Sequence, residues 1–259
     1  MERDSVRSKL LNNLRWRGRL IATALGKRYI WSDIEAIARA QGFPILDVCG
    51  NTEPFEFLAR LGAQAKLEHA GLDFSTIADD RPYNVDGLAH FNAEPSVARF
   101  MGRLAACCGA RHVIELGCYT GWTSTHIALG LKAAGRAGRI TCVDISQHYL
   151  DIARTNLQHL GLAEMASFIC GRSLDRTVQD ALPGRADIIF IDSSHTYQET
   201  VDEIGFYTTR LEPGGMIVLH DSINAPGVRR ALFESRTRFS TLTFATERSN
   251  GLTVLQHLQ

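Results

Sequence analysis

The chain has 259 residues, 45% of them hydrophobic and 22% charged, and its 28 lysines and arginines balance 28 aspartates and glutamates. This length and composition predict a globular protein with one large domain, or one domain with an added cap. A net charge of zero gives no support for a nucleic-acid partner. No apolar run reaches membrane-spanning length and no apolar signal core follows the N-terminus, so we expect a cytoplasmic protein that does not enter a membrane.

The cysteines are scattered along the chain and form no C-x-x-C pair. We therefore expect reduced core thiols, not a disulfide framework or a zinc site. They are Cys49, Cys107, Cys108, Cys118, Cys142 and Cys170.

Residues 1–90 are predicted to be a helical cap or oligomerisation segment. Leu10, Leu14 and Ile21 share one helical face, opposite several arginines, and residues 51–66 form a second helical pattern. A basic amphipathic helix is compatible with a membrane surface, but this segment is short and weakly apolar. A docking cap or a dimer contact is the preferred interpretation, and we expect a homodimer.

Residues 91–259 are predicted to form an α/β domain. After a helix over 95–108, strand and helix patterns alternate, which is typical of a doubly wound parallel sheet. The final two strands are joined through Arg248-Ser249-Asn250-Gly251, a hairpin signal. The expected fold is thus a mostly parallel seven-stranded sheet that ends in an antiparallel hairpin. The predicted strands are 113–116, 140–144, 166–169, 188–192, 216–220, 240–245 and 252–256, and the later helices are 122–132, 149–160, 174–181, 197–211 and 226–234.

A glycine loop follows the first strand, with the spacing Glu115-x-Gly117-x-x-x-Gly121. Glycines let the backbone approach a ligand closely, and the helix that follows offers unpaired N–H groups to an anion. The loop differs from the dinucleotide fingerprint G-x-G-x-x-G, because Tyr119 stands where the second glycine would be. It resembles the first motif of the class I S-adenosylmethionine-dependent methyltransferases, in which this loop surrounds the amino-acid end of the cofactor.

Asp144 ends the second predicted strand, where nucleotide-binding sheets place a carboxylate for the ribose hydroxyls. The alternative is that Asp144 caps the next helix, but Ser146 can serve as that cap. We therefore interpret Asp144 as a ribose ligand.

The loop also resembles that of the small-molecule O-methyltransferases, E-x-G-x-Y-x-G-[YW]-[ST]. This resemblance implies that the Thr123 hydroxyl meets the carboxylate of the cofactor and that Tyr119 packs along its methionine chain. It also implies that Ser173, after the third strand, holds the adenine. Trp122 is equally compatible with core packing.

Polar residues follow the fourth and fifth strands: Asp192 and His195 after one, His220 and Asp221 at the end of the other. Ligands of open α/β sheets bind beyond these strand ends, so the four side chains should meet beside the glycine loop. Carboxylates suit a hard cation such as Mg²⁺, which would acidify a substrate hydroxyl. His195 is a candidate for the base that takes the hydroxyl proton.

The motifs I-D-x-x-H-x-Y, L-x-P-G-G and H-D resemble the macrocin O-methyltransferase and cephalosporin hydroxylase-like group and, more distantly, catechol-type O-methyltransferases. This resemblance implies that Asp192 and Asp221 bind the metal, that Asp192 also borders the cofactor, and that His195 is the base. The third ligand position departs from the pattern, because His220 and Ser222 replace the family's carboxylate or asparagine. Either residue could still bind the metal, and we take His220 as the third ligand. A metal-free enzyme is therefore an alternative. Asp192 could instead be a helix cap, and His195 a helix-capping or hydrogen-bonded structural histidine.

We therefore predict an S-adenosylmethionine-dependent O-methyltransferase that acts on a small-molecule hydroxyl, either a phenol or a sugar-bearing natural product. The alternatives are a metal-independent methyltransferase, a non-catalytic cofactor-binding protein and a nicotinamide-dependent oxidoreductase. The missing second glycine argues against the oxidoreductase.

Overall fold

The computed structural model describes residues 72–77, 81–85, 87, 91–135, 137–244, 246, 248 and 250–257. The predicted helices of residues 1–71 lie outside this part of the chain, so the N-terminal cap and the dimer remain predictions. Two short 3-10 turns, Ser75–Ile77 and Arg81–Tyr83, precede the main domain. Within the described residues, no helix is both long enough and apolar enough to cross a membrane.

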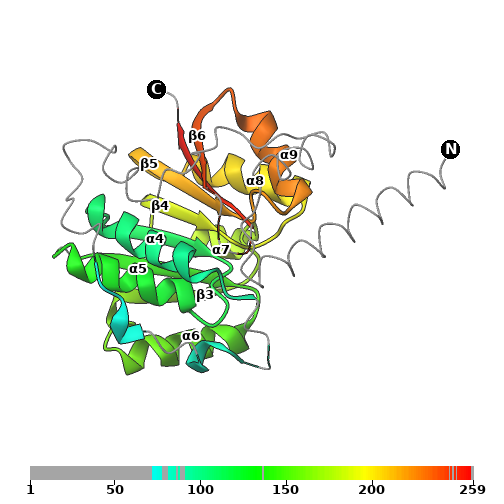
Figure 1. The fold of residues 1–259 in the computed structure, drawn as a ribbon. Coiled ribbons are helices and arrows are strands. Elements are labelled where there is room, and N and C mark those ends of the chain that lie inside the picture. The colour runs from blue at the N-terminus through cyan, green and yellow to red at the C-terminus, as the bar shows by residue number, and fades with distance from the viewer. Residues whose placement is uncertain are drawn as a thin grey trace.

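The domain is built on a seven-stranded sheet with the order β3-β2-β1-β4-β5-β7-β6 (Figure 1). The first five strands pair in parallel, whereas β7 runs antiparallel to both of its neighbours. This arrangement confirms the predicted fold class. The strands are β1 (His112–Leu116), β2 (Arg139–Asp144), β3 (Ala166–Cys170), β4 (Ala186–Ile191), β5 (Leu211–His220), β6 (Phe239–Phe244) and β7 (Leu252–His257).

Successive residues of each central strand point to opposite faces of the sheet, so these apolar strands present a hydrophobic surface on both sides. Helices cover both of these surfaces. In β4, Ile188 and Phe190 join one buried cluster, which also includes side chains of α4, α5 and α6. Ile189 and Ile191 join a second cluster together with α7, α8 and α9. The helices are α4 (Pro95–Cys107), α5 (Trp122–Ala133), α6 (Gln147–His159), α7 (Arg176–Ala181), α8 (Tyr197–Thr208) and α9 (Pro226–Ser235).

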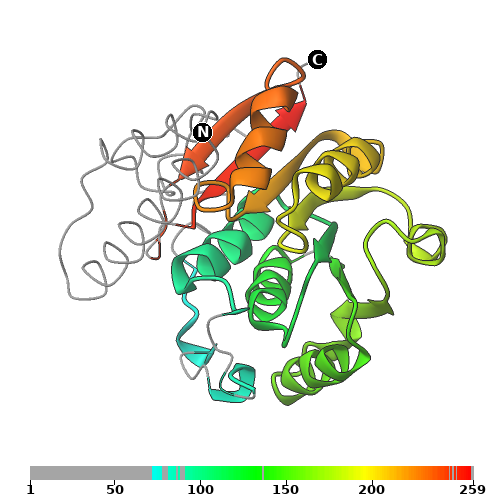
Figure 2. The ribbon, with the colours of Figure 1, turned by 90° about the vertical axis from the view of Figure 1, so that its right-hand side faces the viewer.

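The antiparallel pair β6 and β7 closes one end of the sheet, and α6 lies at the opposite end (Figure 2). The largest difference from the predicted boundaries is in β5, which begins at Leu211 and includes the Pro-Gly-Gly segment, whereas the predicted strand covers only 216–220. Leu211 pairs with Ala186 before the register shifts at Ile188. The strand therefore starts before its buried apolar run, where the sequence signal was weak.

The prediction that the cysteines are core thiols is correct for three of the five in the described residues, and Cys49 lies outside them. Cys107, Cys118 and Cys142 are buried and reduced, whereas Cys108 and Cys170 are exposed. Both exposed residues lie at ends of elements, Cys108 after α4 and Cys170 at the end of β3, where apolar neighbours in sequence do not ensure burial.

The packing of α4 against α5 depends on two glycines that face each other. A Cβ atom at Gly130 would lie 1.9 Å from the carbonyl oxygen of Gly102. Gly130→Ala should therefore lower the free energy of unfolding by about 2 kcal/mol or more, as overpacking does. Gly205→Ala is the matched control, since it is also helical but meets no atom within 4 Å. It should stabilise the protein by about 1 kcal/mol through helix propensity. Urea unfolding of both variants tests this, and equal stabilities would contradict the close helix contact.

Candidate active site

A cavity of about 580 Å³ lies at the carboxyl ends of the parallel strands. This volume is within the range of small-molecule sites. Eight of the residues predicted from the sequence line it: Gly117, Tyr119, Asp144, Ser173, Asp192, His195, His220 and Asp221. Glu115, Gly121 and Thr123 are not among its lining residues.

Gly117 brings the loop after β1 against the end of β4. Its φ of 83° is in the left-handed region, and a Cβ atom would lie 2.2 Å from the carbonyl oxygen of Asp192. The backbone N–H of Asp192 donates to the carbonyl oxygen of Leu116 at 2.9 Å. Only glycine fits this position, because any side chain would collide with the backbone beside it.

The other predicted loop residues form the interior support of the loop. Gly121 has a φ of 83° and caps α5, while Thr123 is buried in the first turn of that helix. Glu115 is fully buried in β1 and accepts a hydrogen bond from the Ser124 hydroxyl at 2.5 Å. Burial raises the pKa of Glu115 to about 8. Glu115 therefore ties β1 to α5 from behind the cavity.

Asp144 holds the glycine loop with both of its carboxylate oxygens. Oδ2 accepts from the backbone N–H of Tyr119, and Oδ1 accepts from that of Ser146, each at 2.9 Å. The cap of α6 is Ser146, whose side chain accepts from the backbone N–H of Tyr149. Asp144 is thus not the helix cap, and each of its oxygens keeps a lone pair for a ligand.

Aromatic and apolar groups line the cavity beside Asp144. The ring of Tyr119 contacts that of Tyr149 at a centroid distance of 4.5 Å and that of Phe91 at 5.9 Å. Ile145 is 74% exposed and is also part of the lining. Trp122 instead packs in the interior against Tyr83 and His126, which agrees with the core-packing interpretation of this residue.

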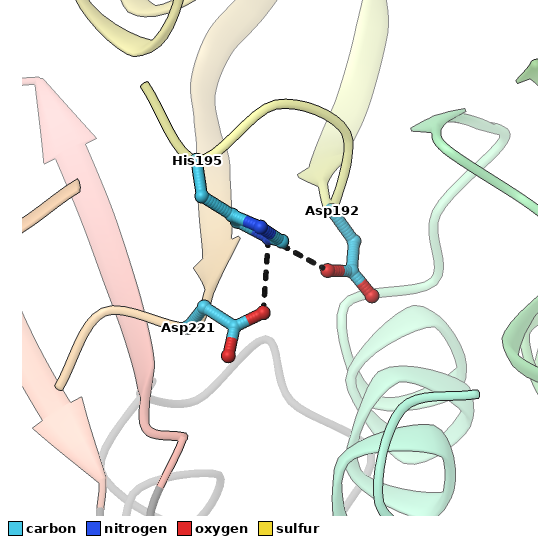
Figure 3. Close-up of side chains that lie close together, drawn as sticks. All are labelled: Asp192, His195 and Asp221. Atoms are coloured by element: carbon cyan, nitrogen blue, oxygen red, sulfur yellow. Dashed lines mark ion pairs between the residues drawn. The ribbon is translucent and has the colours of Figure 1, made fainter. Parts of the chain in front are cut away.

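Three side chains from two strand ends meet on the other side of the cavity (Figure 3). His195 Nε2 lies 2.9 Å from Asp221 Oδ2 and 3.7 Å from Asp192 Oδ1. Their possible metal-ligating atoms are all within 4.8 Å of one another. Asp221 has a φ of 53°, a strained conformation for a non-glycine residue, which turns its carboxylate toward this cluster.

The two carboxylates set the protonation of His195. Asp192 and Asp221 raise the pKa of this imidazole to about 10, against the effect of its partial burial. Burial would raise the pKa values of Asp192 and Asp221, but the neighbouring histidines outweigh burial and lower both. At neutral pH the cluster therefore holds two carboxylates and an imidazolium.

His220 is placed differently from the predicted metal ligand. Its Nδ1 lies 3.0 Å from Asp192 Oδ1, and its Nε2 lies 2.6 Å from Oε2 of Glu94. Both ring nitrogens therefore face carboxylates, and His220 is outside the group whose ligand atoms converge. Ser222, the other candidate for a third ligand, is buried and does not line the cavity. His220 supports Asp192 from behind.

Glu94 supports this site from the interior and was not predicted from the sequence. It precedes α4, is fully buried, and accepts hydrogen bonds from Thr246 at 2.6 Å and from the backbone of Arg248 at 3.3 Å. Burial alone would raise the pKa of Glu94, but the hydrogen bond with His220 and the attraction of its positive charge hold this pKa below the ordinary value. Because 126 residues separate Glu94 from His220, no local pattern in the sequence indicates the pair.

The sequence of this chain is similar to those of known methyltransferases. A family model described as a methyltransferase domain matches residues 114–222. The chain is 29% identical to the catechol O-methyltransferase of Mycobacterium tuberculosis over 162 aligned residues. The alignment covers 60% of this chain and 71% of that protein.

Solved structures share the fold. An O-methyltransferase from Bacillus cereus in complex with S-adenosylhomocysteine has a TM-score of 0.59 at 20% identity, over 81% of this chain and 93% of that one. The O-methyltransferase TomG of Streptomyces achromogenes, solved with S-adenosylmethionine, has a TM-score of 0.58 at 18% identity, over 72% and 94%.

The pair of Glu94 and His220 predicts a specific loss of acid stability. A carboxyl group whose pKa is lowered by folding stabilises the protein above its unfolded pKa of 4.5, and this contribution is lost as the pH falls through the folded value. Glu94→Gln should therefore lower the free energy of unfolding by about 1–3 kcal/mol at pH 7 and make its decline below pH 4.5 shallower. Urea unfolding between pH 3 and 7 measures both effects. The exposed control Glu164→Gln should follow the wild type, and parallel curves for Glu94→Gln and the wild type would exclude the pair as a source of stability.

Proposed function

Because this chain belongs to the class I S-adenosylmethionine-dependent O-methyltransferases, we propose that it methylates a hydroxyl group of a small molecule beside Asp192, His195 and Asp221. The observation that carries this proposal is that one cavity is lined both by Asp144 and by this cluster. A nucleoside held at Asp144 and an acceptor held at the cluster would then share one enclosed space. Close positioning of donor and acceptor is the main requirement of an in-line methyl transfer.

The residues around Asp144 fit S-adenosylmethionine, which supplies the methyl group on its sulfonium centre. Each oxygen of Asp144 already accepts one backbone N–H and can accept one ribose hydroxyl as well. The exposed side chain of Ile145 offers an apolar surface to a purine ring. Gly117, which lines the cavity together with Asp144 and Asp192, would allow the protein backbone to approach the methionine part of the cofactor closely.

The carboxylates of Asp192 and Asp221 also fit a divalent cation. They are only 13% and 14% exposed, and their oxygens are of the type that Mg²⁺ prefers. A cation bound there would lower the pKa of an acceptor hydroxyl. With both carboxylates engaged in this way, His195 would lose the two partners that raise its pKa and would become available to accept the hydroxyl proton.

A metal-independent methyltransferase is the second candidate, and one observation favours it. The imidazole of His195 already lies between the two carboxylates (Figure 3). In that case His195 would act as a base only once its own proton is lost, at alkaline pH.

The acceptor is proposed to be a phenol or a hydroxyl of a sugar-bearing natural product. The likeness to a catechol O-methyltransferase makes catechol the first acceptor to assay. A half-exposed His195 at the rim leaves room for a small molecule to approach from solvent.

Calorimetry with S-adenosylhomocysteine tests the cofactor site. The wild type should bind it with micromolar affinity, and Asp144→Ala should weaken binding about tenfold or more, because two ribose hydrogen bonds and the support of the loop are lost. Asp151→Ala removes an exposed carboxylate from α6 and should bind like the wild type. If the wild type shows no binding at high micromolar concentration, the proposed function is wrong.

The pH dependence of methyl transfer to catechol distinguishes the two candidates. After EDTA treatment, activity should rise with pH toward about 10, because only the neutral imidazole of His195 accepts a proton. If a cation is used, added Mg²⁺ should move this rise toward the ordinary histidine value of 6.5 and increase the rate at pH 7.5 by about tenfold or more.

Two variants serve as controls for this experiment. Asp221→Ala should abolish the response to Mg²⁺, and His195→Gln should remove the pH-dependent rise. An EDTA-treated wild type with full activity at pH 7.5 would exclude the cation, and a fully active His195→Gln would exclude the base.

A further inference from the structure

A second buried carboxylate, Glu203, lies beneath the cavity on α8. Its side chain is fully buried, and Oε1 accepts hydrogen bonds from the hydroxyls of Ser173 at 2.5 Å and of Ser193 at 2.6 Å. Oε2 has no hydrogen-bond partner in the described part of the chain. The polar contacts of this carboxylate are therefore directed at the two serines.

Both serines line the cavity but come from different segments. Ser173 follows β3 and Ser193 follows β4, so a single oxygen of Glu203 joins the two loops. One turn farther along α8, the buried Tyr207 donates its hydroxyl proton to the carbonyl oxygen of Ser173 at 2.7 Å. Ser173 is thus fixed by α8 through its backbone and its side chain.

This arrangement determines which hydrogen bonds the serines can offer a ligand. A hydroxyl has one proton and two lone pairs. Because Ser173 and Ser193 both give their proton to Glu203, they present only lone pairs to the cavity. A ligand group that donates hydrogen bonds is accepted there, whereas a carbonyl oxygen would face two acceptors without a proton between them.

The loop that carries Ser173 is within reach of a base whose ribose is held at Asp144. The backbone N–H of Gly171 donates to the carbonyl oxygen of Asp144 at 2.9 Å, so the loop after β3 begins beside the proposed ribose site. Gly171, Arg172 and Ser173 then continue along the cavity wall. A purine attached to that ribose would extend toward the serines.

We propose that Glu203 makes this cavity selective for a 6-aminopurine over a 6-oxopurine, by holding the hydroxyls of Ser173 and Ser193 as acceptors. The inference rests on the proposed function, since it takes the nucleoside of the methyl donor as the ligand. It assigns Glu203 as a positioning residue, which does not touch the ligand itself. It also explains why the fold retains a buried carboxylate with one oxygen lacking a partner, an arrangement that costs stability.

The test compares the binding of S-adenosylhomocysteine with that of S-inosylhomocysteine, which carries a carbonyl oxygen in place of the 6-amino group. The wild type should prefer the adenine compound by roughly 10- to 100-fold. Glu203→Met keeps the size of the side chain but removes the acceptor, which frees the serine protons to rotate toward the cavity. Its preference should fall to about threefold or less, mainly through tighter binding of the inosine compound.

Two further proteins keep the test independent of folding. Asp202→Met removes an exposed carboxylate from the adjacent position of α8 and should keep the wild-type preference. The double variant Ser173→Ala, Ser193→Ala should lose the preference even where Glu203→Met is too unstable to purify, and circular dichroism confirms that each tested protein is folded.

The outcomes separate this inference from the proposed function. Absence of S-adenosylhomocysteine binding by the wild type would contradict the proposed function. Binding of both compounds with similar affinity by the wild type would overturn only the role of Glu203. A preference that is unchanged in folded Glu203→Met, or in the folded double variant, would likewise show that Glu203 is merely a structural link between the loops.

Discussion

The close approach between Gly117 and the backbone of Asp192 places the two halves of the site next to each other. A side chain at Gly117 would overlap the carbonyl oxygen of Asp192, and the backbone N–H of Asp192 donates a hydrogen bond to the carbonyl oxygen of Leu116. The glycine loop and the end of β4 therefore form one surface. Asp144 holds this loop from one side through Tyr119, and His220 supports Asp192 from the other. A change that separated these two strand ends would move the nucleoside site away from the acidic cluster.

Charge is arranged around Asp192 in two layers. Toward the cavity, Asp192 and Asp221 hold the half-exposed His195. Toward the interior, the buried His220 links Asp192 to Glu94 at the start of α4. The pKa of His220 is raised well above 6.5, because the carboxylates outweigh the opposing effect of burial. The interior layer is thus a fixed hydrogen-bonded support, whereas the groups at the cavity remain accessible to a cation or an acceptor.

Much of this architecture was predictable because it follows from periodic patterns and the geometry of parallel sheets. The β-branched runs around Val113 and Ile189 indicated buried strands, and strand ends that share one edge brought Asp192, His195 and Asp221 together. The bond between His220 and Glu94 was not predictable, since the two residues lie 126 positions apart in the sequence and no local pattern links them. The same applies to Glu203, whose role depends on loops after two different strands.

The central claim is that one cavity holds a sulfur-bearing nucleoside at Asp144 and directs its reactive centre toward His195. A crystal structure of the protein with S-adenosylhomocysteine measures this most directly. The ribose hydroxyls should lie within hydrogen-bond distance of Asp144, and the sulfur should face the space between Asp192 and His195. A nucleoside bound elsewhere, or a sulfur that points away from His195, would contradict the claim.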